Sequence, residues 1–417
     1  MISKTGGAAA LLVMASTLLA VPTLAQEDDQ TLAGAISSGK ANVSFRYRYE
    51  HVDQDGFSDN ANASTGLLRL NYRTGSFNNW SAFGEFDYVG EIFLNDFNSA
   101  GGSSPERNSR YPVVADPKGP DLNQLYVDYD VSESTKVRIG RQRIVFDNQR
   151  FVGGVAWRQN EQTYDGLGLT FKGLPNAEVH YNYVTTIRRI FGNDVPSGRW
   201  GTNTHLLNGK INLKDGWSVS PYLYLVDNDS DSGGLGLRTS TSTIGARLTG
   251  GFEAGDGQLN LVAELATQSD AGSNPVNYDA EYFNIGATWE LKNGLSVGLS
   301  WESLGGDPVS GGASFVTPLS TLHLFQGWAD KFLGTPNQGV DDFYVTVKYK
   351  LNKWNLTGVF HDFSAEAGSA DWGTEIDVSA ARAFGDRYGL LLKGAFYNAD
   401  QFATDTNKFW VMFTARY

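Results

Sequence analysis

The chain contains no cysteine among its 417 residues, so it can build neither a disulfide framework nor a thiolate metal site. Methionine and proline are scarce as well, with 3 and 12 residues. After the N-terminal segment there is no run of about 18 apolar residues, which excludes a protein that crosses a membrane with helices. Any membrane-spanning structure in this chain must therefore be built from strands.

The first 25 residues have the pattern of a secretory signal peptide. Lys4 precedes an apolar stretch at residues 8–21, and Ala25 offers a small residue for cleavage before Gln26. We expect a signal peptide over residues 1–25 and a single domain over residues 26–417, because no linker composition divides the remainder. An exported chain without disulfides needs another source of stability, and a closed barrel in a membrane supplies one.

Alternation of apolar and polar residues is the main signal after residue 40. Val43, Phe45 and Tyr47 share one face of a strand, and polar residues lie between them. An aromatic content of 13% and 48 glycines suit interfacial girdles and tightly curved strands. The pattern predicts 18 strands, an even number, near residues 40–51, 65–74, 80–90, 121–131, 135–141, 163–171, 176–187, 204–214, 216–227, 239–250, 257–269, 281–291, 294–303, 341–351, 354–363, 374–384, 387–397 and 407–417.

The last predicted strand indicates how the sheet closes. Phe409, Val411 and Phe413 fall on one face of it, and a terminal aromatic, Tyr417, follows in the same phase. In a closed barrel this strand pairs with the first one, so that no edge remains. We therefore predict an all-β fold, a transmembrane antiparallel β-barrel of about 18 strands in the bacterial outer membrane.

The predicted connections alternate between short and long. Short turns such as 132–134, 292–294 and 384–386 contain Gly, Asn, Asp or Ser, while long loops occupy residues 91–120, 142–162, 188–203 and 303–340. Short turns at one end and long loops at the other are typical of a barrel whose termini face the periplasm.

The polar face of the strands points into a water-filled lumen in such a barrel. Its expected basic side chains include Arg46, Arg48, Arg69 and Arg138, and its acidic ones are nearly as numerous. Two interpretations are open. Separate basic and acidic ladders would select ions, whereas pairing between the charges would only keep the lumen wet.

Two loops carry the candidate site residues. The segment from Arg138 to Gly166 is too polar for a core and too rich in aromatic and aliphatic residues for a free tail, so we expect it to fold into the barrel mouth. Its arginines either grip carboxylates of a solute or brace the loop. The segment 303–340 is the longest connection and is expected to fold inward as well. From the two segments we single out Arg141, Arg143, Arg150, Arg158, Asp165, His323, Trp328 and Asp330.

The same two segments resemble the alginate-export family of outer-membrane porins. The resemblance lies in the Gly-Arg-Gln, Trp-Arg and Asp-Gly steps of the first segment and in the Gly-Trp-Ala-Asp and Thr-Pro steps of the second. It implies an 18-stranded barrel that passes an anionic polysaccharide or its oligomers. The expected partners are outer-membrane lipid and an anionic saccharide, with no nucleic acid, no cofactor and a monomeric state.

Other functions are compatible with parts of the sequence. A channel for small organic acids or hydrophobic compounds needs the same barrel. A barrel lipase would need a serine and a histidine at one height, and Ser296, although in a Gly-x-Ser-x-Gly pattern, opens an alternating strand instead of a strand-to-helix turn. Residues 227–233 resemble a calcium loop whose glycine comes one position late. We expect a channel and no enzyme.

Overall fold

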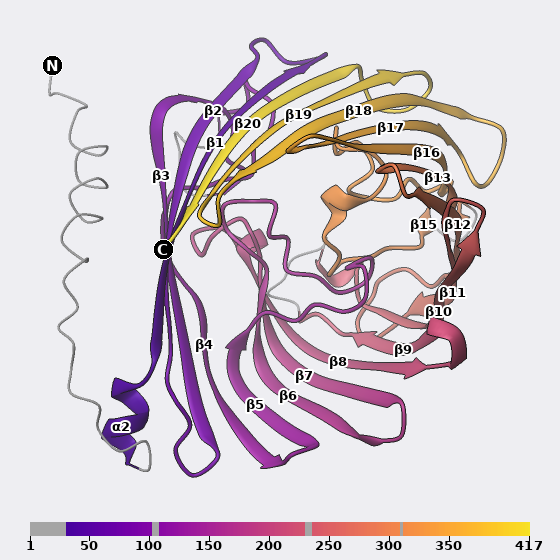
Figure 1. The fold of residues 1–417 in the computed structure, drawn as a ribbon. Coiled ribbons are helices and arrows are strands. Elements are labelled where there is room, and N and C mark those ends of the chain that lie inside the picture. Colours follow the sequence, from indigo (N-terminus) through magenta and orange to yellow (C-terminus); the bar gives the residue numbers. More distant parts are fainter. Residues whose placement is uncertain (1–30, 102–107, 230–235, 309–311) are drawn as a thin grey trace, which may run out of the picture.

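The computed structural model describes residues 31–101, 108–229, 236–308 and 312–417. The predicted signal peptide lies outside these residues, and so does most of the calcium-like loop. Eighteen strands form one antiparallel sheet that closes on itself, which confirms the predicted fold class (Figure 1). Within the described residues, no helix is long and apolar enough to cross a membrane.

The described residues consist mainly of strands joined by turns and loops. The barrel strands are β1 Lys40–Gln54, β2 Ala61–Arg73, β3 Trp80–Asp96, β4 Gly119–Ser132, β5 Thr135–Gln142, β6 Thr163–Leu174, β7 Ala177–Arg188, β8 Arg199–Asn212, β9 Ser218–Val226, β10 Thr241–Ala254, β11 Gly257–Asp270, β12 Asp279–Leu291, β13 Leu295–Leu304, β16 Val340–Leu351, β17 Trp354–Ser364, β18 Asp371–Phe384, β19 Tyr388–Ala399 and β20 Thr406–Arg416. The remaining elements are helix α2 Leu32–Ser37, the short hairpin β14 Gly306–Asp307 and β15 Ala313–Ser314, and 3-10 turns at Pro196–Gly198, Lys214–Gly216 and Leu322–Leu324.

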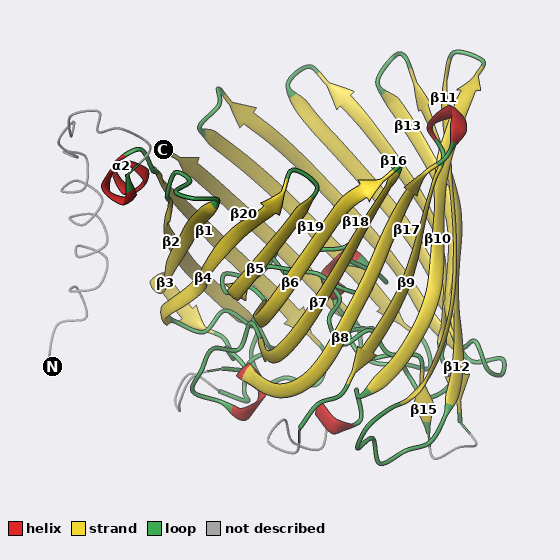
Figure 2. Ribbon diagram, turned by 90° about the horizontal axis from the view of Figure 1, so that it is seen from below, coloured by secondary structure: helices red, strands yellow, loops and turns green. Residues whose placement is uncertain are grey.

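Each predicted strand corresponds to one barrel strand, although several extend further than expected. β3 continues to Asp96 and β8 starts at Arg199, so the loops after β3 and before β8 are shorter than predicted. Helix α2 was not predicted. Its N-cap Thr31 accepts a hydrogen bond from Gly34 N at 2.9 Å, and Gly75 N donates to Ala35 O at 2.7 Å. These contacts hold α2 at the short-turn end of the barrel (Figure 2).

The seam between the first and the last strand closes the barrel. β1 pairs with β20 in antiparallel register, from Ser44 opposite Arg416 to Gln54 opposite Thr406. Closure satisfies the backbone groups that an edge strand would leave unpaired, which is required inside a bilayer. The predicted pairing of the last strand with the first is thus confirmed.

The two faces of the wall differ as the alternation predicts. Leu265, Ile285 and Ile376 are exposed on the outside, where they would meet lipid. Their neighbours in sequence, such as Glu264 on β11 and Glu375 on β18, are buried inside the barrel. A chain whose polar residues lie inside and whose apolar residues lie outside is suited to a membrane and not to water.

Two long loops enter the barrel and pack on each other there. Residues 143–162 and the described part of residues 305–339, which together we call the plug, join through a parallel bridge between Val152 and Leu319, and Gly153 N donates to Leu319 O at 2.8 Å. Figure 1 shows both loops inside the ring of strands. The inward folding predicted for the two segments is therefore confirmed.

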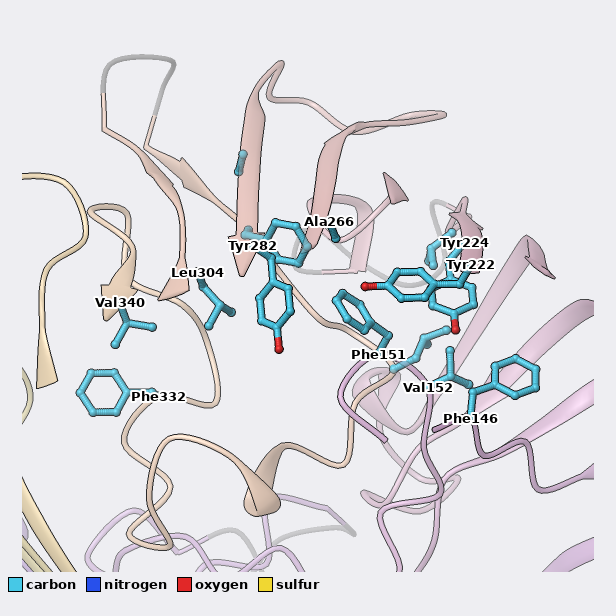
Figure 3. Packing of buried hydrophobic residues seen from close by; sticks show 14 of the residues in the cluster. Phe146, Phe151, Val152, Tyr222, Tyr224, Ala266, Tyr282, Leu304, Phe332 and Val340 are labelled. Carbon is cyan, nitrogen blue, oxygen red and sulfur yellow. The ribbon is translucent and has the colours of Figure 1, made fainter. Parts of the chain in front are cut away.

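The plug has its own apolar core, which extends to the strands on both sides. The Phe151 ring lies 4.9 Å from Tyr222 and 5.3 Å from Tyr282, and Phe332 lies 4.5 Å from Phe363 (Figure 3 labels all but Phe363). One cluster of buried residues therefore runs from β9 through the plug to β17. Such packing fixes the plug and narrows the water-filled space beside it.

Candidate functional site

A row of arginines lines the inner wall of β2 to β5. Arg69 is directly opposite Asp87 in the β2–β3 register, and Arg138 is opposite Asp128 in the β4–β5 register. Cross-strand neighbours point to the same face of a sheet, so each guanidinium is placed next to a carboxylate. We call Arg69, Arg73 and Arg138, together with Arg143 at the start of the plug, the arginine wall.

The carboxylates of this wall are shared between arginines. Arg69 grips Asp87 with two hydrogen bonds of 2.8 and 2.7 Å and also pairs with Glu161 of the plug at 2.7 Å. Arg143 donates to the same Glu161 at 2.6 Å. Burial alone would raise the pKa of Glu161, but Arg69 and Arg143 more than offset it and lower the pKa below its usual value. Glu161 therefore stays ionised and ties the plug to the wall.

Exposure decides which charge the lumen meets. The Asp128 side chain is 1% exposed, while its two partners Arg73 and Arg138 are 42% and 27% exposed. Glu85 and Glu161 are likewise far less exposed than Arg143. The acidic groups lie behind and the guanidiniums in front, so the wall presents positive charge although its charges are paired. Both interpretations of the lumen charges apply here, since pairing and a positive surface coexist.

Other arginines hold the plug. Arg158 pairs with Glu50 of β1 at 2.9 Å and with Asp330 at 3.4 Å, and Arg48 pairs with Asp116. Burial alone would raise the pKa of Asp116, but Arg48 and Arg158 lower it below its usual value. Because these groups are buried, they are braces in the structure.

Arg46 and Arg150 complete the bracing set. Arg46 donates to Gln159 Oε1 and to Ala156 O, each at 2.8 Å. Arg150 Nε lies 2.8 Å from Glu302 Oε1, and its guanidinium lies 4.7 Å from the centre of the Phe325 ring. Bracing was the alternative weighed for the loop arginines, and the geometry of Arg46, Arg150 and Arg158 favours it.

His323 lies at the centre of the plug. Its Nδ1 is 2.6 Å from Asp330 Oδ1, its Nε2 is 2.7 Å from Lys393 Nζ, and its ring stacks on Trp157 at 4.4 Å. Burial lowers the pKa of His323 to about 3 despite the opposing effect of Asp330. The neutral ring then donates from Nδ1 to Asp330 and accepts at Nε2 from Lys393.

Trp328 and its neighbours dock the plug on β18. Trp328 N donates to Asp377 Oδ2 at 3.0 Å, and Ala329 N donates to Glu375 Oε1 at 2.7 Å. The Trp328 ring also holds Lys393 Nζ at 3.7 Å. Sequence reasoning named Trp328 and Asp330 as candidates and placed Lys393 in the lumen by its phase. It missed Glu375 and Asp377, whose inward phase on β18 was the available signal.

The structure corrects two predicted pore residues. Arg141 and Asp165 face the outside, because they are cross-strand neighbours in one row with Leu125, which is 54% exposed. Arg141 alternates with Gln142, which is buried inside. The expectation that Arg141 and Asp165 line the pore is wrong, since the prediction followed the motif and not the phase of the strand. Among the described residues no group of His, Cys, Asp and Glu could hold a metal ion.

Comparison with known proteins agrees with this geometry. Residues 40–181 match the model of a family described as alginate export. The fold matches Acinetobacter baumannii OccAB2 (TM-score 0.72, 13% identity, 92% of this chain and 98% of that chain). It also matches Pseudomonas aeruginosa OpdK, solved with vanillate (TM-score 0.72, 13% identity, 92% and 100%). No curated protein sequence matches the chain. Residues 40–181 are therefore similar to the alginate-export family, and the barrel as a whole has the fold of outer-membrane porins.

Proposed function

We propose that this porin passes anionic, hydroxylated solutes, such as uronate saccharides of the alginate type. The observation that carries the proposal is the arginine wall, in which the guanidiniums of Arg73, Arg138 and Arg143 are exposed while the carboxylates that they pair with are buried behind them. A guanidinium binds a carboxylate through two parallel hydrogen bonds and keeps its charge at any physiological pH. A row of them along one wall would draw carboxylate groups through the lumen.

The wall across the lumen has the opposite character. In a ring of 18 strands, β10 to β12 lie opposite β1 to β3. A pocket of about 460 Å³ there is bordered by small and amide side chains, including Gly251, Gln258, Asn260 and Thr288. Hydroxyl and amide groups both donate and accept hydrogen bonds, as sugar hydroxyls do. An anionic sugar between the two walls would direct its carboxylate to one wall and its hydroxyls to the other.

A second candidate is a channel for small organic acids without sugar hydroxyls. The plug favours it, because the packed cluster from β9 to β17 leaves less room than an open 18-stranded barrel would. OpdK, which shares the fold, was solved with vanillate, an aromatic acid. Such a solute would use the arginine wall and leave the amide groups of β11 unused.

Planar-bilayer recording tests the proposal. The double variant Arg73→Gln/Arg143→Gln removes two positive charges from the wall. The buried carboxylates keep a partner, because Asp128 still pairs with Arg138 and Glu161 still pairs with Arg69. The exposed charges act through screened solvent, so we expect the anion-over-cation permeability to fall about two- to fivefold. Arg382→Gln, an arginine beside Trp354 and Phe384 on the outer wall, is the matched control. Unchanged selectivity in the double variant would refute the role of the arginine wall.

A second recording separates the two candidate solutes. Asn260→Leu removes an amide from the wall across the lumen without removing a charge. We expect it to weaken block by uronate oligomers and to leave block by an aromatic carboxylate unchanged. Unchanged block by the uronate oligomers would contradict a role for the amide wall and favour the small organic acids, whereas equal loss for both solutes would contradict the distinction between them.

A further inference from the structure

An ion cluster lies on the outer surface of the barrel, where the wall should be apolar. Arg141 Nε donates to Asp165 Oδ1 at 2.7 Å, and Arg188 Nε donates to Asp165 Oδ2 at 3.2 Å. Asn193 Oδ1 accepts from Arg188 Nη1 at 2.9 Å, and Asn193 Nδ2 donates to Asp121 Oδ1 at 3.4 Å, so a second carboxylate lies beside the two arginines. In strand register Arg188 is also directly opposite Arg199 of β8. Three arginines thus gather on the outer side of β5, β7 and β8.

The alternation of inward and outward side chains along the strands places this cluster on the outer face of the barrel. Arg141 is opposite Leu125 in one direction and Asp165 in the other. Leu125 is exposed, whereas Tyr164 and Ile187, which alternate with Asp165 and Arg188, are fully buried inside. These arginines therefore contact neither the plug nor the solute in the lumen.

The height of the cluster fits the headgroup region of the outer leaflet. Arg141 is the penultimate residue of β5, Arg188 ends β7 and Arg199 begins β8, all at the loop end of the barrel. Two residues below Arg141, Ile139 is 49% exposed and belongs to the apolar belt. Loops of such barrels face the cell exterior, and an arginine just above the belt avoids the cost of burial in hydrocarbon.

The guanidiniums keep hydrogen-bonding capacity. Asp165 accepts both Nε–H groups and, at 3.4 Å, one Nη–H of Arg141. Leu122 O accepts another Nη–H of Arg141 at 2.7 Å, and Asn193 accepts one of Arg188. Since a guanidinium has five N–H groups, donors remain on both arginines to reach an outer ligand. Asp165 fixes the two planes side by side, which suits an anion with several oxygens such as a phosphate.

The far side of the barrel shows that the arrangement is local. At the loop end of β11 and β12 the outward residues are Thr267, Ser269, Asp279 and Glu281, which border a groove without a basic side chain. An anionic headgroup would be repelled there and attracted at β5 to β8. The outer surface is therefore polarised around the barrel axis.

We propose that Arg141 and Arg188, with Arg199 beside them, bind a phosphate group of lipid A, the phosphorylated glycolipid of the outer leaflet. The apolar belt beneath the cluster would contact the acyl chains, and the guanidiniums would hold the phosphate at the headgroup level. This site fixes the protein to its lipid on one side only. It is independent of the solute that passes through the lumen.

Lipid binding to the purified full-length porin in mild detergent tests the site. Wild type, Arg141→Gln with Arg188→Gln, and Arg382→Gln would be titrated with bisphosphorylated lipid A, and bound lipid would be counted by native mass spectrometry. We expect the double variant to bind lipid A roughly tenfold more weakly, because each arginine near an anionic surface contributes attraction. Arg382→Gln, an outward arginine at the short-turn end, should bind like wild type.

Further arms distinguish the source of the phosphate. Phosphatidylglycerol and free phosphate should not compete with lipid A for the wild type, and equal competition would overturn the assignment to lipid A. Equal lipid A binding by wild type and the double variant would overturn the site itself. If the double variant does not fold, as judged by heat-modifiable migration, Arg188→Gln alone should bind about threefold more weakly. Binding equal to wild type would then overturn it.

Discussion

The same arrangement, two arginines on one aspartate, occurs on both sides of the barrel wall. Inside, Arg73 and Arg138 share Asp128; outside, Arg141 and Arg188 share Asp165. Arg138 and Arg141 are three residues apart on β5, an odd number, so they point to opposite faces. The comparison teaches that in a barrel the parity of a position decides whether a charge meets solute or lipid.

The largest effect is expected from the bracing arginines, which are buried, unlike the arginines of these two pairs. Arg150 and its partner Glu302 are almost fully buried, so Arg150→Leu leaves an uncompensated buried carboxylate. Losing one partner of a buried pair costs about 3–5 kcal/mol. We expect the plug to loosen, single-channel conductance to rise and protease to cut residues 305–339 in the folded porin.

A second substitution provides the control for that result. Arg150→Leu combined with Glu302→Gln removes the charge that Arg150→Leu leaves behind, so plug order should return in part. Arg138→Leu should leave the plug intact, because Asp128 still pairs with Arg73 in that variant. If Arg138→Leu loosened the plug as much as Arg150→Leu, the division between bracing and lumen arginines would be wrong.

Acid is expected to produce the next largest effect. Arginine stays charged at any recording pH, so a pH response must come from another group, and His323 in the plug is placed to give it. Burial lowers its pKa in the docked plug to about 3, below the ordinary 6.5. The released plug then binds more protons than the docked plug below pH 6.5, and docking weakens by about 1.4 kcal/mol per pH unit down to pH 3.

Recording at pH 7.5, 6 and 5 checks this sign. Conductance should rise below pH 6.5, because protonated His323 carries a positive charge next to Lys393 and Arg158. Asp330, whose pKa lies well below its ordinary value, acts in the same direction only in stronger acid. His323→Gln should abolish the change between pH 6.5 and 5. Persistence of the full pH response in that variant would contradict the assignment to His323.

The smallest effect tests the parity argument directly. Arg138→Gln should lower anion preference by at most about fivefold, since the exposed charge contributes roughly 1 kcal/mol or less. Arg141→Gln, three residues away, should leave selectivity unchanged, because its side chain faces lipid. Reversal potentials in a salt gradient measure both. A selectivity change with Arg141→Gln equal to that with Arg138→Gln would show that the outer cluster communicates with the lumen.

Periodicity was sufficient to predict the fold but only part of the site. The 18 strands and the alternating connectors follow from local alternation and turn residues, which act over a few positions. The inward phase of Arg69 and Arg138 follows from the same rule. Arg141 was misplaced because a motif was followed against that rule. The phase of β5 had already been available from Val137 and Ile139.

The contacts of the plug were beyond prediction for a different reason. Glu302 meets Arg150 and Lys408 meets Asp330 only because two loops far apart in sequence cross the lumen together. The local sequence pattern does not predict contacts between loops that are distant in sequence. Asp116, the partner of Arg48, lies in a loop that carries no motif. Sequence alone could predict that these loops fold inward, from their apolar content, but not what they touch.

The β1–β20 seam also governs how the barrel assembles. Every other strand pair joins neighbours along the chain, so the sheet can grow one hairpin at a time, whereas the seam brings Ser44 to Arg416. Closing so long a loop costs more chain entropy than closing a hairpin, which makes the seam the slow step. Until it forms, β1 and β20 are open edges able to recruit other strands. The last pairing therefore determines whether a nascent sheet becomes a pore or an aggregate.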